Sequence, residues 1–332
     1  MRTMRADEQA SYYESVFAAH MAGFVRYKRA QGLSYADVPK SLRALSRFIA
    51  STGHTDLTIS QELIDQWCHR RPNERRSNQH KRVVHTNQFL SYLAAQGVTV
   101  AFPQTPNRRR DRESFTPYVF TRRELDQLFA ACDRLEAKAP SVMPVLLPVL
   151  FRLLYGCGLR VSEALNLTRC DVDLDNCCLT IRHAKYDQDR LVPLSSSMAV
   201  IMRRYDATTP RLFTADRDTW FFTHKDGRPV APDSIYRWFR KTLWAAGISH
   251  GGRGHGPRVH DLRHTFAVYS LKAMVDQGAD VYWALPTLAT YLGHASVAAT
   301  GQYVRLIPDM FPEVTAAVSA IASRVIPGGE PE

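Results

Sequence analysis

The amino-acid sequence predicts a mainly α-helical protein with a small antiparallel β-sheet, divided into two domains. Residues 9–97 carry apolar residues at helical spacing, and glycines close the successive segments. Apolar and polar residues alternate as in strands at residues 178–183 and 190–194, which are close enough in sequence to pair as a hairpin. Residues 103–117 contain three prolines and a run of arginines, a composition typical of an exposed linker. The length of 332 residues, about twice that of a usual domain, agrees with this division.

The first domain is expected to be a helical bundle over residues 1–102. Its helices are expected at about Tyr12–Ala30, at Val38–Ala50, after an N-cap at Thr58 or Ser60, and from about Asn73 to Gly97. On the last of these helices, polar residues recur at helical spacing, namely Arg75, Gln79, Arg82 and Thr86. We interpret this stripe as an exposed basic face.

The chain is strongly basic, with a formal net charge of +11 and a sequence pI near 9.5. Residues 1–117 hold 18 Lys and Arg against 10 Asp and Glu, so most of the excess lies in the first third. This distribution favours a polyanionic partner, although a solvated surface has the same composition. The cationic candidates for such contacts are Arg75, Arg76, Lys81, Arg82, Arg108, Arg109 and Arg110. The last three belong to the linker, which acts either as a solubilising connector or as a strap along phosphates.

The sequence argues against several functional classes. The N-terminal segment lacks the apolar core of a secretory signal, and residues 142–154 are too interrupted by prolines and Arg152 to span a bilayer. The six cysteines are scattered without a CxxC pair, which favours reduced thiols in a cytoplasmic protein. The sequence contains neither a Walker phosphate loop nor a carboxylate cluster for Mg²⁺. We therefore expect no metal and no other cofactor.

The second domain is expected over residues 118–326, followed by a disordered tail at 327–332. Thr121 and Glu124 form a capping-box pattern at the head of a helix, and an apolar helix follows at about Val142–Tyr155. The hairpin comes next, and helices then return toward the end of the domain. This domain is expected to be mixed, with the sheet as a small insertion among helices.

Four separated segments of the second domain place unusual polar residues in structured surroundings. The first, YGCGLRVSEALNL, sets Arg160 at the start of a helix with Glu163 three residues later, a spacing that lets the carboxylate hold the guanidinium. The second is the hairpin connection, which contains Lys185 shortly before the strand residues RLVPL. Each also has an ordinary interpretation, respectively a weak surface ion pair and a solvated turn lysine.

The third segment, HDLRHTFA, sets His260 and Arg263 one turn apart on a shared helix face. His264 lies at the i, i+4 spacing of zinc-binding helices, but an aspartate stands where the HExxH motif requires glutamate. His264 is therefore interpreted as a histidine that caps the core. The fourth segment, YLGHASVAATGQYVRL, contains His294 and, nine residues later, Tyr303.

Taken in order, an arginine, a hairpin lysine, a His-x-x-Arg pair, a Gly-His pair and a tyrosine resemble the tyrosine recombinase (phage integrase) family over essentially the whole chain. The resemblance implies an N-terminal helical core-binding bundle of the SAM-like type and a C-terminal tyrosine-recombinase catalytic domain, which together clamp duplex DNA. It assigns catalytic roles to Arg160, Lys185, His260, Arg263, His294 and Tyr303.

This set of residues suits phosphodiester exchange. A tyrosine hydroxyl has an unperturbed pKa near ~10 and needs a neighbouring base, for which His260 is the candidate. Arg160 and Arg263 can donate paired hydrogen bonds to the phosphate in its transition state. The resemblance implies that Lys185 protonates the departing 5′-oxygen and that His294 hydrogen-bonds the phosphate. It also implies a 3′-phosphotyrosine intermediate that stores the bond energy without ATP or a metal.

The sequence therefore predicts a cytoplasmic site-specific recombinase of a mobile element, an integrase or transposase. The resemblance implies that it acts as a homotetramer on two DNA sites, alone or with other recombinases or DNA-bending proteins. An apolar stripe at residues 310–321 either packs on its own domain or docks into a neighbouring protomer. The alternatives are an Xer-like resolvase of DNA multimers, a non-catalytic DNA-binding protein that keeps the fold, and a zinc-dependent hydrolase built on His260 and His264.

Overall fold

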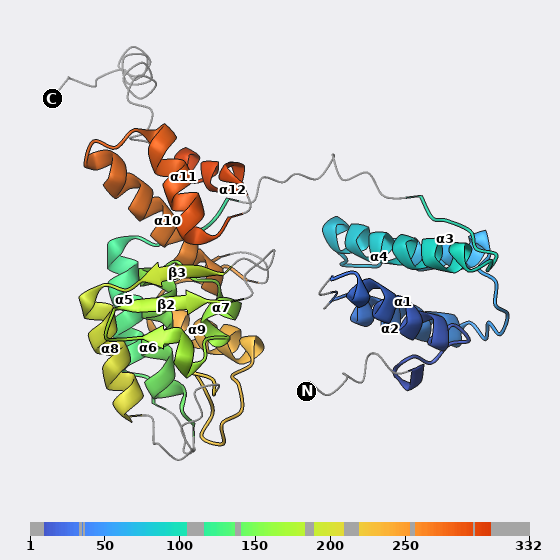
Figure 1. Ribbon diagram of the computed structural model, residues 1–332, viewed down its shortest axis with the longest axis horizontal. Coiled ribbons are helices and arrows are strands. Elements are labelled where there is room, and N and C mark those ends of the chain that lie inside the picture. The colour runs from blue at the N-terminus through green and yellow to red at the C-terminus, as the bar shows by residue number, and fades with distance from the viewer. Residues whose placement is uncertain are drawn as a thin grey trace, which may run out of the picture. The chain divides into compact units, whose positions relative to one another are not determined.

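The structure, a computed structural model, describes residues 10–32, 35, 37–104, 116–136, 141–182, 189–208, 219–252, 256–294 and 296–306. The chain divides into two compact units, Met1–Phe115 and Thr116–Glu332 (Figure 1), and each has its own apolar core. Several predicted features lie outside the described residues, namely Arg108, Arg109, Arg110, Lys185, the stripe 310–321 and the tail. No helix within the described ranges is both long and apolar enough to cross a membrane.

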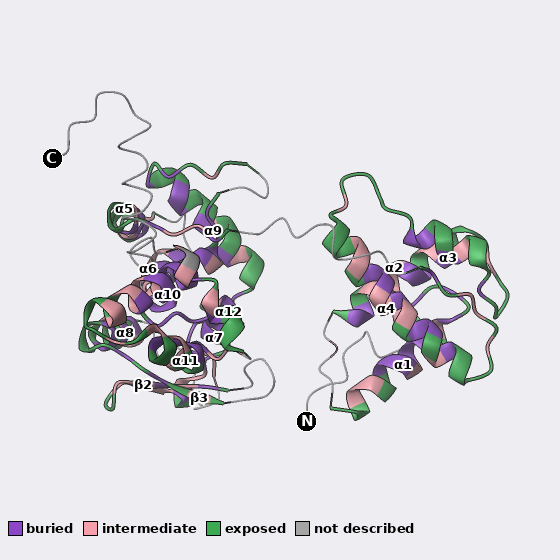
Figure 2. Cartoon of the chain, turned by 90° about the horizontal axis from the view of Figure 1, so that it is seen from above, coloured by how far each residue is buried: buried purple, intermediate pink, exposed green. Residues whose placement is uncertain are grey.

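Four helices and one 3-10 turn make up the described part of the N-terminal unit. They are the turn η2 (Ala10–Tyr12) and the helices α1 (Ala18–Ala30), α2 (Val38–Ser51), α3 (Gln61–Cys68) and α4 (Arg76–Ala95). The buried residues of these helices form a single apolar cluster, and Figure 2 shows them on the inner sides of the bundle. The N-cap at Ser60 is confirmed, since its hydroxyl accepts a hydrogen bond from Leu63 N at 3.3 Å.

α1 begins later than the sequence predicts, at Ala18 and not near Tyr12. The backbone N–H groups of Glu14 and Ser15 both donate to the hydroxyl of Ser46 on α2, each at 2.8 Å. These contacts tie the segment before the helix to a neighbouring element. The start of α1 is thus decided by a tertiary contact that the local pattern does not contain.

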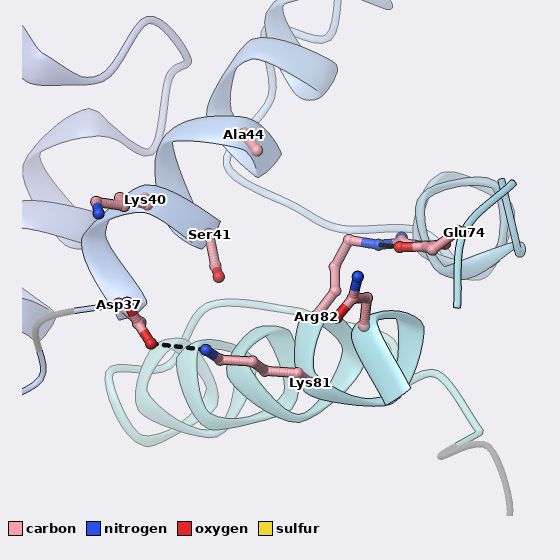
Figure 3. A pocket seen from close by; sticks show the side chains of 8 residues that line it. Asp37, Lys40, Ser41, Ala44, Glu74, Lys81 and Arg82 are labelled. Carbon is pink, nitrogen blue, oxygen red and sulfur yellow. Dashed lines mark hydrogen bonds and ion pairs between the residues drawn. The ribbon is translucent and has the colours of Figure 1, made fainter. Parts of the chain in front are cut away.

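The prediction that Arg82 lies on an exposed basic face of α4 is wrong. Its side chain is only 8% exposed, and its guanidinium donates to Glu74 at 2.7 Å, to His69 O at 3.1 Å and to Trp67 O. Figure 3 shows Arg82 and Glu74 turned toward each other. The C-terminal end of α3 leaves carbonyls without helical partners, and Arg82 satisfies them from the next helix. Thr86, from the same predicted stripe, is also buried and accepts a hydrogen bond from Trp67 Nε1 at 3.0 Å.

The C-terminal unit is a helical body with a small sheet along one side (Figure 1). Its helices are α5 (Arg122–Asp133), α6 (Met143–Gly156), α7 (Val161–Leu165), α8 (Ser196–Thr208), α9 (Pro232–Ala245), α10 (Val259–Asp276), α11 (Val281–Leu292) and α12 (Val297–Gly301). Two 3-10 turns, η4 (Arg169–Asp171) and η5 (Val304–Leu306), accompany them. The strands β1 (Val172–Asp173), β2 (Cys178–Ile181) and β3 (Arg190–Pro193) form one antiparallel sheet in the order β1-β2-β3.

The predicted capping box and hairpin are both confirmed. Glu124 N donates to Thr121 Oγ1 at 3.2 Å and Thr121 N donates to Glu124 Oε2 at 2.8 Å, so each residue caps the other at the start of α5. β2 pairs with β3 in a register that sets Ile181 opposite Arg190. The inward side chains of β2 join the core beneath the sheet, and this packing fixes where Arg190 stands.

Candidate active site

Three segments that are distant in sequence meet in the C-terminal unit. The start of α7 supplies Arg160, the first turns of α10 supply Arg263 and His264, and the chain after α11 supplies His294 and Tyr303. Arg160 Nη2 donates to Gly293 O at 3.0 Å, which joins the first segment to the third. His264 Nδ1 and Tyr303 Oη are 2.9 Å apart, which joins the second to the third. The predicted residues that the structure describes are therefore gathered in one place.

Two glycines with left-handed backbone conformations shape the site. Gly158 has φ +59° and lies against α10, where a Cβ would come within 2.4 Å of the Phe266 ring. Gly293 has φ +63° and ends α11, so the chain turns back and His294 N donates to Ala289 O at 2.9 Å. A side chain at either position would meet both steric contact and backbone strain. Gly158 thus sets the direction of the chain into Arg160 at the start of α7, and Gly293 sets the direction of the chain into His294 after α11.

The two predicted arginines are held by backbone carbonyls. Arg263 is 1% exposed, and its guanidinium donates to Gly158 O and Leu292 O, both at 2.7 Å. Arg160 is more open, with a side chain that is 23% exposed. Burial, together with the charge of Arg160, lowers the pKa of Arg263 to about 10, which still leaves it charged at neutral pH. The site therefore keeps two guanidinium groups side by side.

Glu163 is the carboxylate on which the arginines converge. It accepts hydrogen bonds from Arg160 N at 2.9 Å and Arg160 Nη1 at 2.5 Å, as its position three residues after Arg160 predicts. It also accepts two from Arg190 of β3, at 2.8 and 3.1 Å. Burial opposes its ionisation, but the hydrogen bonds from Arg190 and Arg160 lower the pKa of Glu163 to about 2. Glu163 is thus an anion throughout the physiological range.

Tyr303 lies among imidazole rings and is 1% exposed. The Tyr303 hydroxyl is hydrogen-bonded to His264 Nδ1. The ring of His294 stacks on the Tyr303 ring, with 6.3 Å between the ring centroids. The ring of His260 stands edge-on to that of His264 at 4.7 Å. The pKa values of His260, His264 and His294 are each lowered to about 4, and burial is the largest cause. At neutral pH these rings are uncharged and can accept a proton.

The sequence interpretation missed two members of this cluster. His264 is buried, with 7% of its surface exposed, which confirms its expected place in the core, but its hydrogen bond to the Tyr303 hydroxyl is not predicted; its i, i+4 relation to His260 is the available signal. Arg190 is the first residue of the predicted strand RLVPL, and no local spacing connects it with Glu163. Among the described residues, no group of three or more His, Cys, Asp or Glu is placed to hold a metal ion.

Sequence comparisons show the family of this chain. The model of the phage integrase family matches residues 118–309, more than half of the chain. The chain belongs to the phage integrase family. A Sinorhizobium fredii protein named as an integrase/recombinase (y4rB) is 28% identical over 308 residues, which cover 90% of this chain and 96% of that protein. The tyrosine recombinase XerC of Staphylococcus carnosus is 25% identical over 233 residues, covering 70% of this chain and 72% of that protein.

Solved structures of tyrosine recombinases share the fold of this family member. The Tn1549 transposon integrase in complex with transposon right end DNA gives a TM-score of 0.60 at 15% identity, covering 90% of this chain and 98% of that chain. The XerH recombinase bound to a palindromic difH substrate gives 0.54 at 17% identity, covering 91% and 78%. These likenesses concern the fold alone. Together with the family match, they confirm the predicted fold class and the resemblance to tyrosine recombinases.

Proposed function

We propose that this integrase-family protein is a site-specific recombinase that cuts and rejoins duplex DNA through Tyr303. The observation that carries the proposal is that three separate segments gather Tyr303, two arginines and uncharged imidazoles: the Tyr303 hydroxyl is hydrogen-bonded to His264, and Arg160 and Arg263 donate to carbonyls of the segment that leads to Tyr303. Arginine pairs of this kind stabilise the charge that develops on a phosphate in its transition state. A hydroxyl next to a neutral imidazole can lose its proton as it attacks.

In the proposed reaction the Tyr303 oxygen forms a bond to phosphorus, and the bond between phosphorus and the 5′-oxygen breaks. The phenolic proton passes to an imidazole, and the departing 5′-oxygen takes up a proton, for which Lys185 stays the predicted donor. The 3′-phosphotyrosine link keeps the energy of the broken bond, so rejoining runs the same steps backwards with another 5′-hydroxyl. Neither ATP nor a metal is needed for this exchange.

We propose His264, and not His260, as the first acceptor of the Tyr303 proton, which requires that their hydrogen bond is kept or formed again when the Tyr303 segment moves. His264 Nδ1 is within hydrogen-bond reach of the hydroxyl at 2.9 Å, and burial, which lowers the pKa of His264 to about 4, keeps the ring uncharged at neutral pH. The tautomer that carries its proton on Nε2 can accept the Tyr303 proton at Nδ1. His260, the residue that the resemblance assigns, contacts the ring of His264. Single-turnover cleavage by His264→Asn and His260→Asn separates the two roles. A larger loss in the His260 variant contradicts the assignment to His264.

Tyr303 must become accessible before it can react. A side chain that is 1% exposed leaves no room for a phosphate to approach its hydroxyl, so residues 297–306 have to move relative to α10. We expect hydrogen–deuterium exchange in this segment to increase when the protein binds a cleavable DNA site. Unchanged protection in a complex that still cleaves would contradict this requirement.

Exposed cations on both units are suited to the phosphate backbone of DNA. In the C-terminal unit, α9 buries Ile235, Phe239 and Leu243 and turns its cations outward, namely Arg237, Arg240 and Lys241. In the N-terminal unit, Arg75, Arg76 and Lys81 are exposed. Such cations contribute to affinity through the release of counterions and set no base preference. Arg108, Arg109 and Arg110 of the linker stay predicted contacts.

A shallow pocket on the N-terminal unit adds to this cationic surface (Figure 3). Its volume is about 330 Å³, and its lining includes Lys40 of α2 and Lys81 of α4, of which Lys81 extends toward Asp37 (Figure 3). Lys81 is held by Asp37 at 2.6 Å, but both side chains are more than half exposed, at 53% and 62%. An ion pair so exposed to water is weak and can exchange its carboxylate for a phosphate.

We further propose that the recombination serves the movement of a mobile element, carried out by a tetramer on two DNA sites. The Sinorhizobium fredii relative, whose alignment covers 90% of this chain, is named as an integrase/recombinase, which supports this role. The second candidate is an Xer-like resolvase, which the match to XerC supports. Cleavage of the DNA ends of a mobile element that carries the gene of this protein, with no cleavage of the host's chromosomal dimer-resolution site, supports the first role. The reverse pattern supports the second.

A nicked duplex that carries the candidate site tests the chemistry. Cleavage releases a short fragment from the nicked strand, so the covalent complex is trapped and can be seen on a denaturing gel. We expect an adduct with the wild-type protein, in the presence of EDTA, and none with Tyr303→Phe. An adduct that survives in Tyr303→Phe, or that EDTA abolishes, contradicts the proposal.

A further inference from the structure

Three arginines bind three consecutive carbonyls at the C-terminal end of α11. Arg190 Nε donates to Tyr291 O at 3.1 Å, Arg263 Nη2 to Leu292 O at 2.7 Å and Arg160 Nη2 to Gly293 O at 3.0 Å. The end of a helix leaves its last carbonyls without amide partners and carries partial negative charge, so it suits cations. Two of these arginines belong to the proposed phosphate site. Arg190, the third, is not among the residues proposed to contact the phosphate.

Arg190 also forms the fullest contact with Glu163. Its two terminal nitrogens lie 2.8 and 3.1 Å from the two carboxylate oxygens, a forked pair that Arg160 and Arg263 do not form. Arg263 reaches the same carboxylate only at 3.7 Å. The side chains of Arg190 and Glu163 are 12% and 6% exposed, so little water competes for this pair.

We propose that Arg190 is a positioning residue for the strand-exchange site: it occupies Glu163 and anchors the end of α11, which leaves donors of Arg160 and Arg263 for the scissile phosphate. This inference rests on the proposed function. Without Arg190, the buried carboxylate would be balanced by Arg160 and Arg263 alone, and both guanidinium groups would be drawn onto it. The net charge of the three arginines and Glu163 would fall from two positive charges to one.

The contact between Arg190 and the end of α11 reaches the third segment of the site. A Cβ at Gly293 would lie 2.9 Å from Arg190 Nη1, so the guanidinium rests against the glycine backbone. His294 follows directly, and its Nδ1 lies 2.8 Å from Thr300 Oγ1 on the way to Tyr303. Arg190 therefore contacts the turn from which the imidazole and the nucleophile segment continue. Its hydrogen bonds go to Glu163 and to the Tyr291 carbonyl and not to Tyr303, and so it acts through other residues.

The test compares single and double variants of the full-length protein. Single-turnover cleavage of the nicked duplex is measured at saturating protein concentration for wild type, Arg190→Gln, Glu163→Gln and the double variant. The temperature is kept below the melting temperature of the least stable of these proteins. Arg152→Gln is the matched control, because Arg152 forms an ion pair with Asp133 between α5 and α6, outside the site. We expect Arg190→Gln to slow cleavage of bound DNA by about 10- to 100-fold. Arg152→Gln should cleave at the wild-type rate.

The decisive result is a reversal of sign. Glu163→Gln should slow the wild-type protein, because it loosens Arg160, yet it should speed up Arg190→Gln, because it removes the anion that captures the arginines. A role of Arg190 in folding alone predicts that Glu163→Gln slows both proteins. That outcome, or a wild-type rate in Arg190→Gln, overturns the inference.

Two further results keep the test complete. If Arg190→Gln does not fold, Arg190→Lys is measured, since its ammonium neutralises Glu163 but cannot also reach the Tyr291 carbonyl. It should cleave at least about 5-fold more slowly than wild type, and an unchanged rate overturns the inference. If the wild-type protein forms no adduct on any site, the proposed function itself fails. An adduct in wild type with no effect of Arg190 overturns the present inference alone.

Discussion

The two units of this protein each bury an arginine against a glutamate and the carbonyls at a helix end, but with different stoichiometry. In the N-terminal unit, Arg82 pairs with Glu74 and satisfies two carbonyls near the end of α3. In the C-terminal unit, three arginines share one Glu163 and the end of α11. The first arrangement is electrically balanced, whereas the second keeps an excess of positive charge. A buried arginine cluster with equal numbers of cations and carboxylates stabilises the fold, whereas one in which arginines exceed carboxylates can also bind an anion.

The largest expected effect is on the balanced pair. Arg82→Gln leaves Glu74 and two carbonyls without their donor, and removal of one partner from a buried ion pair costs about 3–5 kcal/mol of unfolding free energy. Chemical denaturation measures this loss. The salt dependence of DNA binding by the folded protein should not change, because Arg82 does not face solvent. A variant with wild-type stability and a reduced salt slope would show that Arg82 faces DNA after all.

The next effect is on the site with excess charge. Arg160→Gln removes a donor from the proposed transition state and should slow cleavage of bound DNA by about 10²- to 10³-fold. Because Arg160 is 23% exposed, the melting temperature should change far less than in Arg82→Gln. Single-turnover cleavage and thermal unfolding of the same samples give both numbers. A loss of stability as large as that of Arg82→Gln would remove the contrast between the two clusters.

A smaller effect concerns pH. His264 has a pKa of about 4 in the fold, below its ordinary value of about 6.5, so the unfolded chain binds more protons between these limits. Stability contributed by this neutral imidazole is full above about pH 6.5 and is lost as the pH falls toward 4. Its share of the loss between pH 7.5 and 5.5 is about 1 kcal/mol. His264→Asn should show a correspondingly weaker pH dependence in denaturation curves; an identical dependence would contradict the burial of a neutral ring.

The smallest expected effect belongs to the surface of the N-terminal unit. Arg75→Gln should reduce the slope of log K against log salt concentration by about 1, with little change in stability or in cleavage once DNA is bound. Fluorescence anisotropy over a range of salt concentrations measures the slope. Glu62→Gln, at an exposed position of α3, is a matched control that removes a surface charge of the other sign. An unchanged slope in Arg75→Gln would place this side of α4 away from DNA.

Much of the site could be predicted from the sequence because its parts are local. Gly158 and Gly293 mark the turns, Glu163 follows Arg160 by one helical turn, and His260 and Arg263 share a helix face. The pairing of His264 with Tyr303 could not be predicted, since 39 residues separate them and the contact of η5, next to Tyr303, with α10 brings them together. The same holds for Arg190 and Glu163, which are 27 residues apart and meet through the register of β3.

The sequence by itself determined the element types, the turns and the set of residues that identifies a tyrosine recombinase. Those features depend on short spacings, which act within one helix or turn. The tertiary structure decided where each long side chain finds its partner, because an arginine or histidine reaches whatever packs opposite it. Arg82 has the polar pattern of a surface residue and is buried, whereas Arg190 has no pattern of its own and lies among the catalytic candidates. The positions of the charged residues are thus read from the sequence, but the partners of their side chains are decided by tertiary packing.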